Sequence, residues 1–158
     1  MSKLLKALNE IKQAEITAVL TFMAHTDALN NLGFGVLAKL YQKEAVEELG
    51  HAARFAERIY FLGGTPATTP LAPPNVGKDL KDILKKDAAM EKAQIDRIRR
   101  AVKLALDEGD PGSRSLLEQV LTDEEHHYAT LTQMHDNFEK YGIGYLAVAA
   151  KEGAEGGE

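Results

Sequence analysis

The sequence predicts an all-α protein in which four long helices form a single bundle. Apolar residues recur at steps of three and four over four long segments, which is the pattern of helices with one buried face. Stretches rich in glycine and proline separate these segments. The chain has 158 residues, enough for one domain in which four such helices share a full core.

Composition excludes several classes of function. The chain contains no cysteine, which excludes disulfides, thiolate zinc sites and thiol nucleophiles. The net charge is −5, and scattered basic residues do not form the concentrated basic face that nucleic-acid binding requires. No apolar stretch is long enough to cross a membrane, and the N-terminus shows no leader-like apolar region. We therefore expect a cytoplasmic protein that binds neither nucleic acids nor membranes.

The first two predicted helices are separated by a turn at Asn30-Asn31-Leu32-Gly33, and the second ends at Gly63-Gly64. Each helix carries acidic residues or histidine within its apolar stripe, where further apolar residues would be expected. The two stripes are Leu4, Leu8, Ile11, Glu15, Ala18, Phe22, His25 and Leu29, and then Leu37, Tyr41, Glu44, Glu48, His51, Phe55 and Leu62.

Residues 63–77 hold four of the five prolines and form an irregular connection. A connection of this length predicts a crossover along the bundle, with the second and third helices parallel. The third helix is expected from about Lys78 to Glu108. Its stripe and that of the fourth helix are Leu84, Asp87, Glu91, Gln94, Ile98 and Ala105, and then Leu117, Val120, Glu124, His127, Leu131, Met134, Phe138 and Tyr141.

After Gly142 the apolar segment 145–150 predicts a short fifth helix, because it is too short to span a membrane. The residues that follow are polar and rich in glycine, which is typical of a disordered end. We therefore predict one domain over residues 1–151 and a disordered tail over residues 152–158.

Six residues that interrupt the stripes form two equivalent sets. Each member of the second set lies 76 residues after its counterpart in the first. A Glu-x-x-His pair stacks an oxygen and a nitrogen ligand on one helix face, so both reach the same metal cluster. A carboxylate and a Glu-x-x-His pair, used twice, is the ligand set of a two-metal site in a four-helix bundle. The predicted metal ligands and catalytic residues are Glu15, Glu48, His51, Glu91, Glu124 and His127.

Charge favours two metal ions at this site. Four carboxylates at mid-bundle carry four negative charges, which two divalent cations neutralise, whereas an unpaired buried carboxylate costs several kcal/mol. Oxygen and imidazole ligands without thiolate suit iron or manganese, and zinc can occupy such a site as a redox-inert competitor. The alternative is that these glutamates are solvated helix residues, but each would then have to fall on an apolar stripe by accident.

Four further polar residues are candidates for roles outside the ligand set. His25 lies ten residues beyond Glu15, about 15 Å along a helix, so we interpret it as a core or interface histidine. Asp123 and His126 are rotated off the stripe of the fourth helix. We expect them either at the surface or in contact with the metal ligands without binding metal themselves. Glu44 can be an outer ligand, an entry-path carboxylate or a solvated residue at the mouth of the bundle.

These motifs resemble those of bacterioferritins. The resemblance implies a ferritin-like bundle that oxidises Fe(II) with dioxygen or peroxide and stores ferric mineral in a cage of 24 subunits. It also implies that Glu48 and Glu124 bridge two iron ions, with Glu15 and His51 on one ion and Glu91 and His127 on the other. The matching segments are Leu8-Asn9-Glu10, Glu48-Leu49-Gly50-His51-Ala52, Glu57-Arg58-Ile59, Phe61-Leu62-Gly63-Gly64 and Asp123-Glu124-Glu125-His126-His127.

The chain also departs from that family. The haem-binding methionine of bacterioferritins is Leu49 here, and leucine offers iron no donor atom, so we expect no such haem. An auxiliary inner-surface iron site uses a histidine and an aspartate where this chain has Lys43 and Glu47. A tyrosine often found beside the di-iron centre is Phe22 here.

Two other functions stay open. One is a non-mineralising di-iron or di-manganese oxidase or peroxidase that resembles rubrerythrin. Rubrerythrins carry an extra carboxylate where this chain has Gln94, and they usually append a cysteine-ligated iron domain, which a chain without cysteine cannot form. The other is a bundle that scaffolds or binds a partner, with metal incidental to its role.

Overall fold

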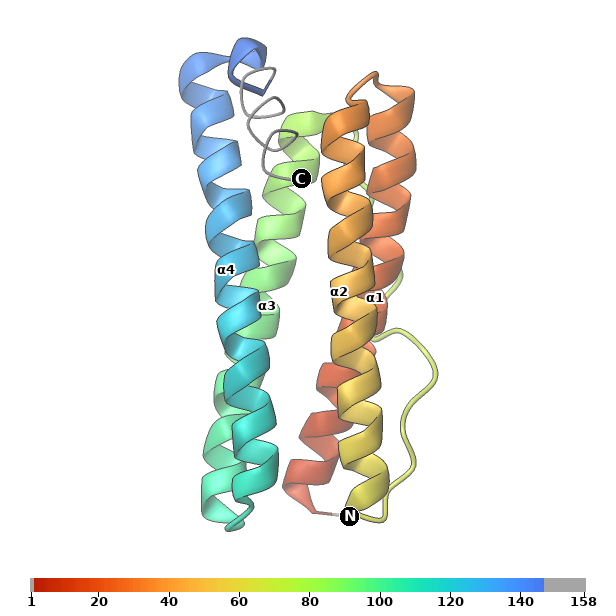
Figure 1. Ribbon diagram of the computed structural model, residues 1–158, viewed down its shortest axis with the longest axis vertical. Coiled ribbons are helices and arrows are strands. Elements are labelled where there is room, and N and C mark those ends of the chain that lie inside the picture. Colours follow the sequence, from red (N-terminus) through yellow and green to blue (C-terminus); the bar gives the residue numbers. More distant parts are fainter. Residues whose placement is uncertain (1, 147–158) are drawn as a thin grey trace, which may run out of the picture.

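The computed structural model describes residues 2–146, which fold into four long helices (Figure 1). This confirms the predicted four-helix bundle. Residues 143–146 begin a further helical turn, while the rest of the predicted fifth helix and the predicted tail lie outside the described residues. Within residues 2–146, no helix is long and apolar enough to cross a membrane. The helices are α1 (Lys3–Asn31), α2 (Gly35–Phe61), α3 (Leu80–Asp107) and α4 (Pro111–Tyr141).

Local sequence explains where three helices begin. The side chains of Ser2, Asp79 and Asp110 each accept a hydrogen bond from a backbone N–H in the first turn of α1, α3 and α4. The third helix therefore begins at Leu80 and not at Lys78, because Asp79 acts as its cap. Pro111 occupies the first turn of α4, where its missing N–H costs nothing.

The crossover between α2 and α3 runs along α1 and returns the chain to the upper end of the bundle (Figure 1). Asn9 Oδ1 accepts from the backbone N–H of Ala67 at 2.7 Å, and the Thr17 hydroxyl donates to the Ala72 carbonyl at 3.1 Å. Because the crossover spans the length of the bundle, α2 and α3 run parallel, as predicted.

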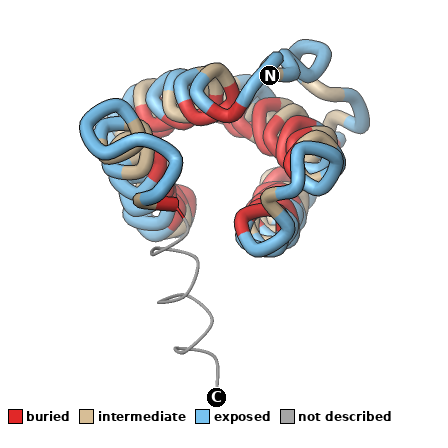
Figure 2. The backbone as a smooth tube through the Cα atoms, turned by 90° about the horizontal axis from the view of Figure 1, so that it is seen from above, coloured by how far each residue is buried: buried red, intermediate tan, exposed pale blue. Residues whose placement is uncertain are grey.

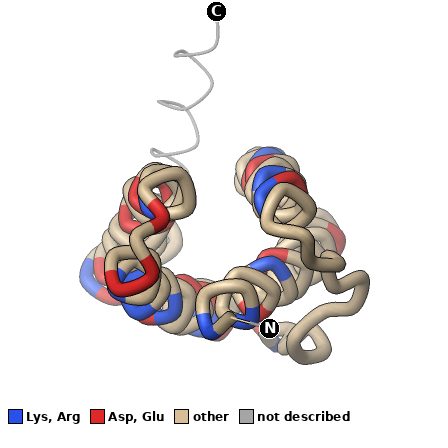
Figure 3. The backbone as a smooth tube through the Cα atoms, turned by 90° about the horizontal axis from the view of Figure 1, so that it is seen from below, with Lys and Arg blue, Asp and Glu red and all other residues tan. Residues whose placement is uncertain are grey.

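The core consists of two apolar clusters at opposite ends of the bundle. Figure 2 shows that the buried residues line the inward faces of the helices, and Figure 3 shows that most charged residues lie outside. The upper apolar cluster includes Phe22, Leu29, Tyr41 and Leu84. The lower apolar cluster is Leu4, Leu8, Ile11, Phe55, Ile59, Ile98, Ala101, Ala105, Leu117 and Val120.

One predicted inward residue lies outside. Tyr141 is 60% exposed. It is the last residue of α4, and the chain turns at Gly142, whose φ is 72°. Its ring therefore lies beside that of Tyr145, with centroids 6.1 Å apart, and not in the bundle.

Candidate metal centre

The six predicted ligands lie together between the two apolar clusters. One glutamate each comes from α1 and α3, and one Glu-x-x-His pair each comes from α2 and α4. None of the six is more than 5% exposed. The 76-residue register therefore corresponds to a real pairing in space, in which each half of the chain contributes one set of three side chains.

The six side chains form two overlapping groups of four. Glu15 and His51 join Glu48 and Glu124 in one group, and Glu91 and His127 join the same two glutamates in the other. Within each group the candidate ligand atoms lie within 4.8 Å of one another. Two carboxylates shared between two sets of ligands is the arrangement that a pair of bridged metal ions requires.

Both histidines turn the same ring nitrogen toward this cluster. His51 Nδ1 lies 3.1 Å from Glu124 Oε1 and 3.2 Å from Glu48 Oε2. His127 Nδ1 lies 3.0 Å from Glu48 Oε1 and 3.3 Å from Glu124 Oε2. The two rings are stacked with centroids 6.2 Å apart. Each Nδ1 is thus placed to give a lone pair to a metal ion beside the shared carboxylates.

The other nitrogen of each ring points to a carboxylate outside the cluster. His51 Nε2 lies 3.1 Å from Asp123 Oδ2, and His127 Nε2 lies 3.0 Å from oxygens of both Glu44 and Glu47. A carboxylate that accepts the N–H of a ligating histidine fixes its tautomer and orientation. In both rings, a proton on Nε2 would be held by these carboxylates, which leaves the lone pair of Nδ1 free for a metal ion.

The pKa shifts in this cluster favour proton binding when no metal is bound. Burial raises the pKa of Glu15 and Glu91, and the negative charges of Glu124 and Glu48 raise it further. Burial alone would lower the pKa of His51, but hydrogen bonds to Glu124 and Glu48 outweigh it and raise the pKa to about 10. The same competition raises the pKa of His127. Burial would raise the pKa of Glu124, yet its hydrogen bonds to the two histidines lower it.

The donor set fits two divalent ions. Glu15 Oε2 and Glu91 Oε1 are buried and have no hydrogen-bond partner within residues 2–146. No lysine or arginine is among the buried residues of the described chain. Cations that bind from solution are therefore the natural partners of these oxygens, because unpaired buried polar atoms are costly.

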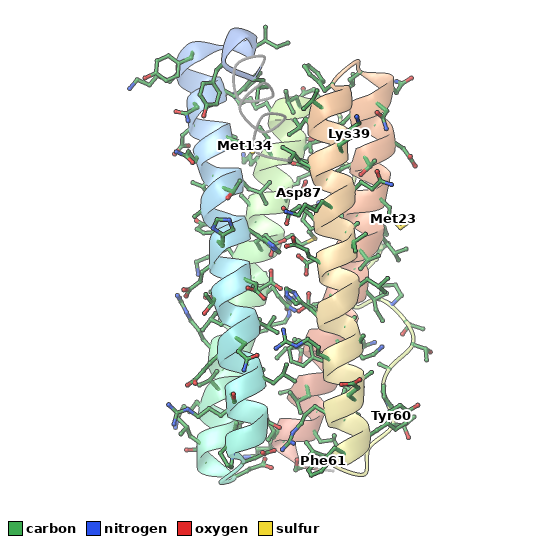
Figure 4. All side chains as sticks on the ribbon, viewed as in Figure 1. Met23, Lys39, Tyr60, Phe61, Asp87 and Met134 are labelled. Atoms are coloured by element: carbon green, nitrogen blue, oxygen red, sulfur yellow. The ribbon has the colours of Figure 1, made fainter. Side chains whose placement is uncertain are left out.

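The remaining sequence candidates have separate roles. His25 is fully buried, and its Nδ1 lies 2.8 Å from Asp87, which points into the bundle (Figure 4). Its Nε2 accepts the backbone N–H of Gly77 at 2.9 Å, so it anchors the crossover, in agreement with the predicted core role. His126 is exposed. Phe22 lies edge-on to Tyr41 in the upper apolar cluster, with ring centroids 5.7 Å apart.

The sequence did not predict three contacts at this site. It left Asp123 and Glu44 open between surface and supporting positions, and the structure places both against histidines of the cluster. It recognised Gln94 as inward but assigned it no role, although Gln94 Nε2 donates to Glu15 Oε1 at 2.8 Å. The signal was present, because an amide on an apolar stripe next to Glu91 must find a polar partner.

Comparison with known protein families and relatives shows which class of protein this chain belongs to. A family model described as a ferritin-like domain matches residues 5–141. The bacterioferritin of Streptomyces coelicolor is 32% identical over 140 residues, which cover 89% of this chain and 84% of the relative. The bacterioferritin of Rhodobacter capsulatus is 30% identical over 157 residues and covers 98% of both chains.

Two solved structures agree with these relatives. Desulfovibrio desulfuricans bacterioferritin, described with its di-iron site in different catalytic states, matches with a TM-score of 0.88 and 29% identity, over 92% of this chain and 85% of that one. Rhodobacter capsulatus bacterioferritin, described with a metal-free dinuclear site and haem iron, matches with a TM-score of 0.89 and 29% identity, over 95% and 96%. This chain belongs to the ferritin-like domain family and, within it, to the bacterioferritins.

Proposed function

We propose that this protein is an iron-storage ferroxidase, which oxidises Fe(II) at a dinuclear centre in each subunit and stores the product as ferric mineral. The observation that carries this proposal is the sharing of Glu48 and Glu124 between two four-residue groups. A site for a single ion needs no shared carboxylates. Two Fe(II) ions held side by side can each give one electron to the same molecule of dioxygen or peroxide.

Each side chain has a role in this proposal. Glu48 and Glu124, which belong to both ligand groups, would hold both iron ions. Glu15 and His51 would hold one ion with them, and Glu91 and His127 would hold the other. Asp123 holds the ring of His51, while Glu44 and Glu47 hold the ring of His127. Manganese can occupy the same oxygen and nitrogen ligands, and zinc can occupy them without redox activity.

We propose a cage of 24 subunits formed from the domain over residues 1–151, as the bacterioferritin relatives suggest. Sedimentation before and after aerobic Fe(II) loading tests both storage and assembly. A large particle that gains mass is the expected result. The rival rubrerythrin-like enzyme would be a small assembly, such as a dimer, that turns over iron without gaining mass, and a scaffold would show no turnover. Zinc loading serves as the control, because zinc binds without being oxidised.

We also propose that the protein binds no haem through position 49. Leu49 lies next to Glu48 but is 59% exposed, off the ligand face of α2. A thioether from each of two subunits would be needed for low-spin haem, and leucine supplies none. Protein purified from haem-replete cells should therefore lack the visible spectrum of bis-thioether haem. A stoichiometric spectrum of that kind would contradict this proposal and would leave the dinuclear centre untouched.

A further inference from the structure

Gln94 is a polar residue at the metal centre that the ligand set does not use. It lies one turn beyond Glu91 on α3 and is only 4% exposed. Its Nε2 donates to Glu15 Oε1 at 2.8 Å and to the Ile11 carbonyl at 3.3 Å. Both N–H groups of the amide are thus engaged by acceptors on α1.

The contact with Ile11 fixes which way the amide faces. If the amide were flipped, Gln94 Oε1 would lie against the Ile11 carbonyl, which can only accept, and oxygen would oppose oxygen there. The observed orientation directs Oε1 elsewhere. This oxygen is buried and has no hydrogen-bond partner within residues 2–146.

Gln94 helps to line a cavity of about 310 Å³ between α1 and α3. Small side chains, among them Ala14 and Ala18, form part of its wall, and residues 71–73 of the crossover cover it. Glu15 and Glu91 also line it, so the cavity reaches the dinuclear cluster. A buried acceptor without a partner, beside a space of this size, is suited to a small ligand that donates a hydrogen bond.

The polar groups around the cavity favour a ligand that donates hydrogen bonds, because the side chains of Glu15, Asp87 and Glu91 line it together with the amide of Gln94. Lys86 and Arg97 also line it, but both are partly exposed and each is paired with a carboxylate, Lys86 with Asp82 and Arg97 with Glu10. Among the oxidants of the proposed reaction, hydrogen peroxide is neutral and donates two hydrogen bonds, whereas dioxygen donates none.

We propose that the cavity between α1 and α3 is a binding site for hydrogen peroxide and that Gln94 Oε1 is its hydrogen-bond acceptor. The inference rests on the proposed function and names the oxidant that this chain prefers. Peroxide held there lies beside Glu15 and Glu91. Two Fe(II) substrates each lose one electron, the O–O bond of peroxide breaks, and two hydroxide ions form, so that electrons and charge balance.

Gln94→Leu tests this role by rapid mixing of protein loaded with two Fe(II) per subunit. The measured quantity is the ratio of the peroxide-driven rate to the dioxygen-driven rate. We expect this ratio to fall about tenfold, the loss typical of one hydrogen bond. Gln119→Leu makes the same chemical change at an exposed position of α4 and should leave the ratio unchanged.

Binding can be measured without turnover in zinc-loaded protein. Titration with hydrogen peroxide should shift the methyl resonances of Ala14 and Ala18 saturably, while Ala101, in the lower apolar cluster, stays unmoved. In Gln94→Leu the same shift should require about tenfold more peroxide. The methyl signals of alanine remain observable in a large assembly.

Three results would overturn the inference. The first is that Gln94→Leu lowers both rates by the same factor, which would mean that Gln94 only positions Glu15. The second is that Gln94→Leu changes neither rate. The third is that peroxide leaves the methyl resonances of Ala14 and Ala18 unmoved. Failure of the proposed function looks different, because wild-type protein would then bind no pair of metal ions or would oxidise Fe(II) with neither oxidant.

Discussion

The two ends of the bundle bury apolar side chains, whereas its middle buries ionisable ones. At the ends, side chains such as Phe55 and Ile98 are fully buried among other apolar groups, which stabilises the fold without any ligand. In the middle, four carboxylates and two imidazoles are equally buried but leave oxygens unpaired. The same helices therefore contain a part that favours folding and a part that opposes it until metal or protons arrive.

This contrast separates stability from activity along a single helix. On α2, Phe55 lies only four residues beyond His51, yet Phe55 packs in the lower apolar cluster and His51 belongs to the candidate metal centre. Long apolar stripes at both ends hold the backbone of the ligands in register. Substitutions at the ends should consequently lower stability and leave metal binding intact. Substitutions in the middle should lower metal binding and activity without lowering the stability of the metal-free protein.

The largest effect on activity is expected from Glu124→Ala. Glu124 is common to both ligand groups, so its loss should leave one weakly held metal ion and abolish fast paired oxidation of Fe(II). The metal-free variant should be at least as stable as the wild type, because one of four crowded carboxylates is gone. Metal titration and thermal unfolding measure the two effects. Binding of two ions with unchanged affinity would refute the assignment of Glu124.

The largest effect on stability is expected from Phe55→Ala. Phe55 is 0% exposed in the lower apolar cluster, and truncating a buried phenylalanine costs about 3–5 kcal/mol through lost burial and the cavity left behind. Denaturant unfolding of the metal-free protein measures this cost. Where the variant is folded, its stoichiometry of metal binding should stay at two ions per subunit. A cost below about 1 kcal/mol would show that the ends do not dominate stability.

The sequence predicted the bundle and the six clustered residues because both follow from periodicity. Glu15 and Glu91 fall on stripes whose apolar members specify the inward face, so their position in space follows from their position in the helix. The contacts of Asp123 and Glu47 could not be predicted in this way. Asp123 lies off the stripe of α4 and meets His51 of α2 only through the rotation and spacing of two helices, which periodicity within one helix does not fix.

The two histidines differ in the number of carboxylates that contact Nε2, so losing one carboxylate should weaken metal binding by different amounts at the two rings. His51 Nε2 has Asp123 alone, whereas His127 Nε2 has both Glu44 and Glu47. Asp123→Ala should weaken metal binding by about 10- to 100-fold, the effect typical of losing such a partner. Glu47→Ala should weaken it by less, because Glu44 remains.

Isothermal titration with a redox-inert divalent ion measures both variants. Asp136→Ala is the matched control, since Asp136 is an exposed aspartate of α4 whose side chain is 71% accessible. Equal losses for Asp123→Ala and Glu47→Ala would mean that the second carboxylate at His127 contributes nothing.

The smallest expected effect is the pH dependence of metal-induced stabilisation, and it distinguishes the middle of the bundle from its ends. In the metal-free protein the pKa values of Glu15 and Glu91 are raised by burial and then by the charges of Glu124 and Glu48. Hydrogen bonds to Glu124 and Glu48 overcome burial to raise the pKa of His51 to about 10. The folded metal-free protein therefore binds more protons than the unfolded chain, and its stability falls as pH rises through these raised pKa values.

Metal binding has the opposite dependence, because the ligands must lose their protons before they coordinate an ion. The rise in Tm on zinc loading should therefore be larger at about pH 8 than at about pH 6. Phe55→Ala should keep this difference at a lower Tm, since it changes only an apolar end. Glu124→Ala should lose most of it. A rise in Tm that is equal at both pH values would show that protons do not occupy the empty centre, and the contrast between the middle and the ends would then reduce to packing alone.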